Sequence, residues 1–134
     1  MLREIWTDGA SLGNPGPAGW AVLFDGELDT DFLPPATNNQ TELFAVYMGL
    51  LKCSSGDTAI IFTDSKMVVG WLGKSWNCEN HLTRGIIEAC LIHKRALGLD
   101  LQFVRVKGHS GIYKNEVVDH AAHQSAKNGK RAKH

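Results

Sequence analysis

Residues 2–9 of the chain read Leu-Arg-Glu-Ile-Trp-Thr-Asp-Gly, and the rest of the sequence is organised around this stretch. Its leucine, isoleucine and tryptophan are typical of a core β-strand, because such side chains suit a pleated surface. Asp8 lies where this apolar run ends, and a carboxylate there is costly unless a partner or a metal ion compensates it. Three later acids, Glu42, Asp64 and Asp119, occupy comparable settings. We therefore expect these four carboxylates to converge into one metal site.

Length and composition indicate one domain of ordinary globular type. The chain has 134 residues, enough to bury roughly two-thirds of its unfolded surface, and 43% of them are apolar. No apolar run approaches the ~18 residues of a membrane span, and the first residues do not resemble a signal peptide. Cys53, Cys78 and Cys90 are an odd number without a close pair. We therefore expect reduced thiols and a cytoplasmic protein that does not bind membranes.

Charge is balanced overall but unevenly distributed. Residues 1–104 carry 7 Lys and Arg against 12 Asp and Glu, whereas residues 105–134 carry 7 Lys and Arg against 2 Asp and Glu. A basic end beside an acidic body permits a polyanionic partner. A solvated basic tail without a partner is the alternative, and charge alone does not decide between the two.

The first part of the chain predicts three antiparallel strands joined by tight turns. Residues 9–17 are too rich in glycine and proline for a long strand, and a second apolar strand follows at residues 20–24. Asp25 and Gly26 form a typical two-residue hairpin turn. A third strand is expected at residues 27–33, before two consecutive prolines.

The remainder alternates helices and strands. Apolar residues take helical spacing from Thr41, with Asn38, Asn39 and Thr41 as candidate caps. We then expect a strand at residues 58–63, a helix at 66–72, a longer helix ending at Gly98, a strand at 101–106 and a last helix from Asn115 to about Lys127. Strand–helix–strand units require parallel neighbours. The order predicts an α/β fold: a mixed five-stranded sheet, three antiparallel N-terminal strands plus two parallel ones, flanked by helices.

The candidate metal site offers only oxygen ligands. Asp8 and Asp64 would lie on adjacent central strands, and Glu42 and Asp119 near helix starts, where partial positive charge tolerates acids. Oxygen ligands without clustered cysteine or histidine favour Mg²⁺ or Mn²⁺ over zinc. Two such ions can clamp the attacking and leaving oxygens of a phosphodiester. Spacing alone leaves open the alternative that these acids are capping and surface residues.

Six short motifs follow one another in a fixed order. They begin at residues 7, 12, 37, 63, 106 and 115 and read Thr-Asp-Gly, Leu-Gly-Asn-Pro-Gly-Pro, Thr-Asn-Asn-Gln-Thr-Glu, Thr-Asp-Ser, Val-Lys-Gly-His-Ser-Gly and Asn-Glu-Val-Val-Asp. Together they resemble type 1 ribonuclease H from about residue 5 to residue 126. The resemblance implies a ribonuclease H-like fold, with the catalytic domain at residues 1–127 and a flexible basic tail at residues 128–134.

The resemblance also implies an activity. Members of this family cleave the RNA strand of RNA–DNA hybrids with two Mg²⁺ ions, for which Mn²⁺ can substitute, and leave a 3′-hydroxyl and a 5′-phosphate. Their metal-binding carboxylates correspond to Asp8, Glu42, Asp64 and Asp119. Their loop histidine, which shuttles a proton or helps to release product, corresponds to His109. A histidine in a glycine-rich loop suits that role, because it titrates near neutrality and moves with the loop.

Substrate contacts are implied by the same resemblance. The minor groove of a hybrid displays 2′-hydroxyls, and amide side chains can both donate to and accept from a hydroxyl. The corresponding candidates for substrate binding are Asn14, Thr37, Asn38, Asn39, Gln40, Ser65, Lys66 and Trp76. Turn formation or helix capping is the alternative role for the three asparagines, and a solvated helix position is the alternative for Lys66.

The chain departs from many family members in lacking most of a basic, tryptophan-rich protrusion. Only Trp71, Lys74, Trp76 and, more distantly, Arg84 remain of it. Trp71 has the helical spacing of a core residue, whereas Trp76 lies in a broken segment from which it can stack on a sugar or base. The loss predicts weaker hybrid binding. The basic residues of the C-terminal end are candidates to compensate: Lys127, Lys130, Arg131 and Lys133.

His120 and His123 are three residues apart on the expected last helix, a spacing that could suggest metal binding. His120 and His123 lack a nearby third ligand type, so we interpret them as surface or helix-packing residues. We expect no N-terminal hybrid-binding domain, no obligate protein partner and a monomer. The alternatives to a stand-alone enzyme are the ribonuclease H domain of a reverse-transcriptase-like protein and a non-catalytic nucleic-acid-binding domain, which should have lost a carboxylate.

Overall fold

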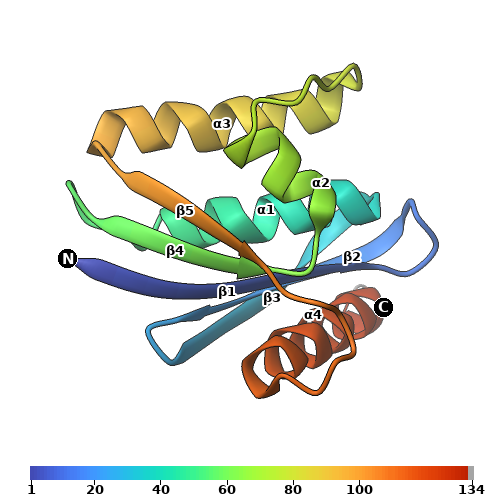
Figure 1. The fold of residues 1–134 in the computed structure, drawn as a ribbon. Coiled ribbons are helices and arrows are strands. Elements are labelled where there is room, and N and C mark those ends of the chain that lie inside the picture. The colour runs from blue at the N-terminus through green and yellow to red at the C-terminus, as the bar shows by residue number, and fades with distance from the viewer. Residues whose placement is uncertain (133–134) are drawn as a thin grey trace.

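The computed structural model describes the backbone of residues 1–132 and the side chains of residues 1–129. Its elements in chain order are β1 (Leu2–Ser11), β2 (Gly16–Phe24), β3 (Glu27–Ala36), α1 (Asn38–Leu50), β4 (Thr58–Thr63), α2 (Lys66–Val68), the π-helix η1 (Val69–Gly73), α3 (His81–Leu97), β5 (Asp100–Arg105) and α4 (Tyr113–Ala132). The strands form one sheet in the order β3-β2-β1-β4-β5 (Figure 1). The pairs β1–β2 and β2–β3 are antiparallel, and β1–β4 and β4–β5 are parallel. The predicted mixed sheet is confirmed.

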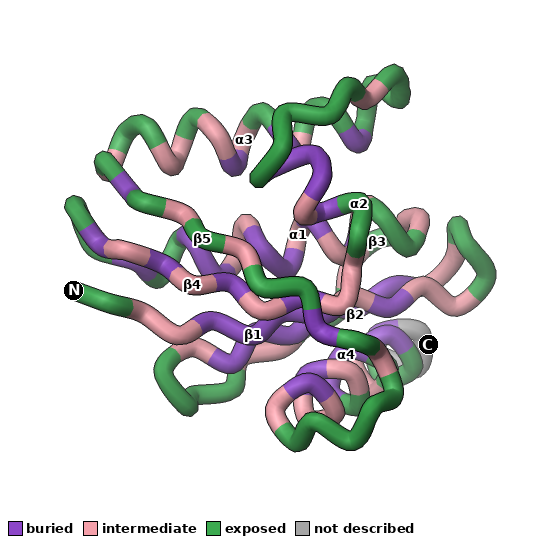
Figure 2. The backbone as a smooth tube through the Cα atoms, viewed as in Figure 1, coloured by how far each residue is buried: buried purple, intermediate pink, exposed green. Residues whose placement is uncertain are grey.

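Helices cover both faces of the sheet. α1 packs on β1 and β2 and carries α3 on its outer side, while α4 crosses β1, β2 and β3 on the opposite face (Figure 1). The larger apolar core lies around Ile5, Leu43 and Ile61. A smaller core under α4 contains Trp6 and Val118. The buried backbone segments in Figure 2 accordingly concentrate in β1, β2 and the helix faces that meet the sheet.

No helix within residues 1–132 is long and apolar enough to cross a membrane. Cys53 and Cys90 are buried, Cys78 is half-buried, and all three are free thiols.

The first two strands are longer than the sequence predicts. β1 continues past Asp8 to Ser11, and β2 begins already at Gly16. The ladder pairs Asp8 with Ala21 and Ser11 with Ala18, so backbone pairing extends into the glycine- and proline-rich segment. Asp8 therefore lies on β1, as predicted, but the strand continues beyond the apolar run to Ser11.

The turn between β2 and β3 has the predicted form. Asp25 and Gly26 have φ values of 47° and 87°, which confirms a hairpin turn with both central residues left-handed. β3 then continues through Pro34 and Pro35 to Ala36, beyond its predicted end. β3 is an edge strand, where a missing N–H is tolerated on the open side.

α1 begins earlier than predicted because Thr37 is its N-cap. The Oγ1 of Thr37 accepts a hydrogen bond from the Gln40 N–H, and the Gln40 Oε1 accepts one from the Thr37 N–H. This reciprocal pair is a capping box. The predicted caps Asn38, Asn39 and Thr41 lie inside the helix instead.

α4 also differs from the prediction at both ends. It starts at Tyr113, so Asn115 is not its cap but a residue inside the helix that is only 2% exposed. It continues past Lys127 to Ala132. The described part of the predicted tail is therefore helical, and the last two residues of that tail lie outside the described residues.

Candidate active site

Three of the predicted carboxylates meet where β1 passes the start of α1 and the end of β4. One oxygen from each of Asp8, Glu42 and Asp64 lies within 4.8 Å of the other two. Asp8 belongs to β1, Glu42 to α1, and Asp64 directly follows β4. The parallel pairing of β1 with β4 thus brings together residues that are far apart in the sequence.

Gly9 holds two of these carboxylates through its backbone. Its N–H donates to Asp8 Oδ1 at 2.9 Å and to Glu42 Oε1 at 3.1 Å. A Cβ at Gly9 would lie 2.4 Å from the carbonyl carbon of Thr41. Only glycine permits β1 to approach the first turns of α1 this closely, and that approach places Glu42 beside Asp8.

Asp119 lies in a second group beside the first. One ligand atom from each of His109, Glu116 and Asp119 lies within 4.8 Å of the other two. The charge of Asp119 raises the pKa of both Asp8 and Asp64, so the two groups adjoin. We did not predict Glu116, although its position three residues before Asp119 on one helix indicates a shared face.

The cluster carries more negative charge than its surroundings favour. Burial, together with the nearby charges of Asp64 and Asp119, raises the pKa of Asp8 to about 7, although a hydrogen bond with Glu42 acts in the opposite direction. Burial and the charge of Asp8 hold the pKa of Glu42 well above its ordinary value. Burial and Asp119 raise the pKa of Asp64, while His109 and Arg105 partly offset them. A bound cation would favour the ionised form of each group.

Helix starts do not supply the compensation that the sequence predicts for Glu42 and Asp119. Both residues lie beyond the first turn of their helices, and the helix dipole acts mainly within that turn. The Oε2 of Glu42 is buried and has no hydrogen-bond partner among the described residues. An orphaned carboxylate oxygen in an all-oxygen cluster fits a hard divalent cation such as Mg²⁺ or Mn²⁺.

The loop before α4 brings His109 to the edge of the cluster. His109 is exposed and has a left-handed φ of 57°. A Cβ at Gly108 would lie 3.2 Å from Asp64 Oδ2, so the loop backbone rests against that carboxylate. The positive charge of His109 lowers the pKa of Asp64. The ring is thus close enough to the carboxylates to influence their protonation.

The loop between β1 and β2 is joined to the start of α1. The Asn38 N–H donates to Asn14 Oδ1 at 2.8 Å. Next to this junction lies a cleft of about 310 Å³, lined by Asn14, Thr37, Asn39, Trp71, Cys78, Asn80 and Thr83. Asn80 lines this cleft, and the sequence analysis did not predict it as a site residue. Its Oδ1 accepts a hydrogen bond from the Thr83 N–H, so Asn80 is the N-cap of α3. An asparagine just before a helix is a recognisable cap.

Ser65 and Lys66 follow Asp64 at the start of the next helix. The Oγ of Ser65 accepts a hydrogen bond from the Val68 N–H and caps α2. Lys66 is exposed, as a phosphate contact or a solvated lysine would be. The helix predicted at 66–72 is correct in position but consists of one α-helical turn followed by the π-helix η1.

The two tryptophans of the reduced protrusion have different surroundings. Trp71 is 6% exposed and packs in the core, as predicted, with its indole N–H donating to the Asn77 carbonyl. Trp76 is 39% exposed, and its ring covers Gly70 so closely that a Cβ there would lie 1.9 Å from it. The Lys74 ammonium lies 5.9 Å from the centre of the Trp76 ring. Trp76 therefore packs one part of its ring on Gly70 and presents another part to solvent.

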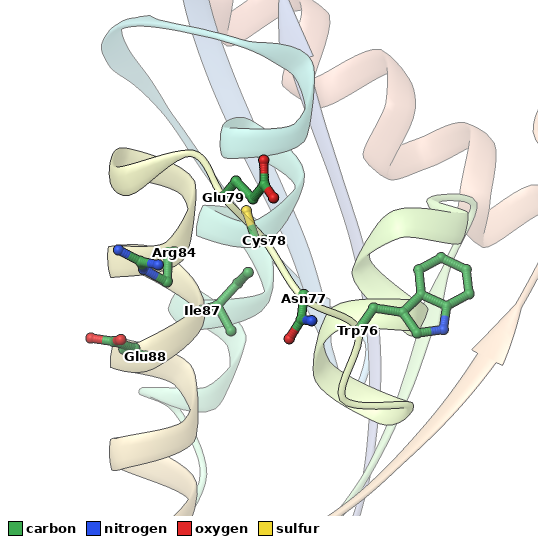
Figure 3. Close-up of a pocket in the computed structure, with 7 residues that line it drawn as sticks. All are labelled: Trp76, Asn77, Cys78, Glu79, Arg84, Ile87 and Glu88. Carbon is green, nitrogen blue, oxygen red and sulfur yellow. The ribbon is translucent and has the colours of Figure 1, made fainter.

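A second pocket separates this loop from α3. It is lined by Trp76, Asn77, Cys78, Glu79, Arg84, Ile87 and Glu88. Figure 3 shows that the Trp76 ring turns away from Arg84 and Glu88, which extend from α3 on the other side. Arg84 and Trp76 therefore do not form one basic aromatic surface.

The fold and the site together define an α/β domain with a cluster of carboxylates, able to hold a metal ion, at the junction of its two central parallel strands. The family model for RNase H matches residues 3–127. A ribonuclease H of Erythrobacter litoralis is 37% identical, and the match covers 92% of this chain and 94% of that protein. The chain therefore belongs to the RNase H family.

Solved structures show the same fold. The N-terminal RNase H domain of a Mycobacterium tuberculosis protein has a TM-score of 0.83 at 22% identity, with 99% of each chain covered. LC11-RNase H1, solved in complex with an RNA/DNA hybrid, has a TM-score of 0.79 at 20% identity and covers 95% of this chain and 98% of its own. The predicted fold class is confirmed.

Proposed function

We propose that this protein is an endoribonuclease that hydrolyses the RNA strand of RNA–DNA hybrids with two divalent ions and leaves 3′-hydroxyl and 5′-phosphate ends. The observation that carries the proposal is the meeting of Asp8, Glu42 and Asp64 within 4.8 Å, in a chain of the RNase H family. Mg²⁺ is the ion we propose, with Mn²⁺ able to substitute.

Four carboxylates would hold the ions. Asp8, Glu42 and Asp64 form one group, and Asp119 adjoins them from α4. Bound divalent ions would lower the pKa of an attacking water and stabilise charge on the attacking and leaving oxygens of the phosphodiester. Burial and mutual repulsion raise the pKa of Asp8 and Glu42, so these groups favour a cation over an empty site.

His109 would move protons at the edge of this cluster. Its ring nitrogen lies within 4.8 Å of ligand atoms of Glu116 and Asp119. Imidazoles serve in proteins as proton acceptors and donors, and an exposed loop residue can shift to let the product leave. We assign His109 this shuttle or release role.

The substrate would lie across the loops next to the cluster. Asn14, Asn38 and Asn39 would meet the minor groove, where amides can recognise 2′-hydroxyls. Thr37 and Gln40 order the start of α1 through the capping box, and they would contact the same nucleic-acid strands of the hybrid. Beyond Asp64, the candidates for backbone or sugar contacts are Ser65, Lys66 and Trp76.

Retention of all four carboxylates supports an enzyme over a domain that only binds nucleic acid. We further propose that the protein acts as a cytoplasmic monomer without an obligate protein partner. The basic residues at the C-terminal end of α4 would contribute to hybrid binding. Unchanged Michaelis constants at several salt concentrations after deletion of residues 128–134 would refute that contribution.

Strand-labelled substrates test the proposed reaction. Wild-type protein with Mg²⁺ should cut RNA in an RNA–DNA hybrid and leave single-stranded RNA, duplex RNA and duplex DNA intact. Asp64→Asn keeps the shape of the side chain but removes a ligand charge, so cutting should be lost. Asp31→Asn, an exposed carboxylate on β3, is the matched control and should cut normally. A wild type that binds the hybrid without cutting it would refute the proposed activity.

A further inference from the structure

His123 lies one helical turn after Asp119 on α4 and contacts it. Its Nδ1 is 3.0 Å from the Asp119 backbone carbonyl oxygen and 3.5 Å from Asp119 Oδ1. A proton on Nδ1 donates to that carbonyl and at the same time turns the positive edge of the ring toward the carboxylate. The imidazole is half exposed, and the Asp119 side chain is 25% exposed.

The other neighbours of the Asp119 carboxylate explain why this contact matters. Asp8 and Asp64 lie near enough for Asp119 to raise their pKa, and Glu116 and the loop residue His109 share its group. The three neighbouring carboxylates carry the same charge as Asp119, and like charges push a partly exposed side chain away from the cluster. His123 instead places an N–H 3.5 Å from Asp119 Oδ1. Because both residues lie on α4, the ring keeps its place beside Asp119.

We propose that His123 is a positioning residue that holds the Asp119 carboxylate in the orientation needed for a divalent cation. This inference rests on the metal site of the proposed function. Partners that hydrogen-bond to a ligand fix its direction, and their loss commonly weakens metal binding on the order of tenfold or more. His123 lies on the surface, as the sequence indicates, and an exposed ring can still orient the side chain of its neighbour.

Three variants separate positioning from a general effect on α4. His123→Ala removes the donor. His123→Gln keeps a neutral N–H donor, because glutamine and aspartate four residues apart on a helix can hydrogen-bond. His120→Ala is the matched control: the same residue type is removed from an exposed position on the same helix, where the ring has no hydrogen bond or ion pair with the described residues.

Binding of Mg²⁺ alone is measured first, by calorimetry and by the rise in melting temperature that Mg²⁺ produces. His123→Ala should weaken Mg²⁺ binding on the order of tenfold, while His123→Gln and His120→Ala should retain wild-type affinity. Equal affinities in wild type and His123→Ala would overturn the inference. A His123→Gln variant that binds Mg²⁺ as weakly as His123→Ala would also overturn the inference. The N–H donor at this position would then not be the cause of the tighter binding.

Hybrid cleavage at varied Mg²⁺ supplies the second readout. His123→Ala should need more Mg²⁺ for half-maximal kcat, with KM for the hybrid unchanged and kcat restored at saturating Mg²⁺. An increase in KM alone would overturn positioning through Asp119. Loss of the proposed function appears differently: wild-type protein would bind Mg²⁺ in a His123-dependent manner but leave the hybrid uncut.

Discussion

Replacing Asp8 with asparagine should stabilise the metal-free protein at neutral and higher pH. Asparagine has nearly the same shape and can still accept the Gly9 N–H that bonds to Asp8 Oδ1 at 2.9 Å. It does not ionise, so it removes one charge from a cluster that also holds Glu42, Asp64 and Asp119. The change therefore isolates the electrostatic cost of the site from its packing.

The magnitude follows from the pKa of Asp8. Burial and neighbouring carboxylates raise this pKa from 3.8 to about 7. Between these values the folded protein binds more protons than the unfolded chain, so its free energy of unfolding falls as pH rises from about 4 to about 7. At 1.36 kcal/mol per pH unit, the loss amounts to about 4 kcal/mol. Asp8→Asn should not show this loss of stability, because asparagine does not ionise.

Urea unfolding in the presence of EDTA at pH 4 and pH 8 measures the effect. The stability gained by Asp8→Asn over wild type should increase by about 4 kcal/mol between the two pH values. Mg²⁺ should then stabilise wild type and not the variant, because a ligand stabilises only the state that binds it. The exposed Asp31→Asn is the control for loss of one charge. A gain that does not grow with pH would refute the reasoning.

Three other substitutions have defined outcomes. Gly9→Ala places a Cβ 2.4 Å from the Thr41 backbone, so thermal unfolding should show a loss of at least about 2 kcal/mol; an unchanged melting temperature would contradict this packing. Asp57→Asn removes the negative charge and one of the two oxygens that accept from Arg3 Nε and the N-terminal amine, whose hydrogen bonds hold the pKa of Asp57 well below its usual range. Wild type should therefore be the more stable above about pH 4, and its advantage should shrink as pH falls further; a constant difference would contradict the pairing. Trp76→Ala should raise the KM for the hybrid about fivefold, as loss of one stacking contact does, and unchanged KM would exclude stacking.

Local patterns in the sequence determined much of the fold. The hairpin at Asp25 and Gly26 follows from a dipeptide that tolerates two left-handed residues. The strand at residues 58–63 follows from its apolar run, and its observed limits are the predicted ones. The order of strands and helices then requires a mixed sheet, because a helical crossover makes its flanking strands parallel.

Element ends were the less predictable part, because individual hydrogen bonds and packing contacts decide them. β1 and β2 extend into a glycine- and proline-rich segment since each supplies hydrogen bonds to the other. α1 starts at Asn38 because Thr37 and Gln40 bond reciprocally. Asn115, a good cap by type, is buried inside α4 instead.

The sequence by itself determined which residues could form the site: oxygen ligands suited to a hard cation, in motifs that resemble one family. Only the tertiary structure decided that Asp8, Glu42 and Asp64 lie within 4.8 Å of one another and that Glu116 and His123 stand beside Asp119. The physical reason is that chemical type and local periodicity belong to the chain. The distances between carboxylates, and hence their raised pKa values, arise only when β1 pairs with β4 and α1 packs against Gly9.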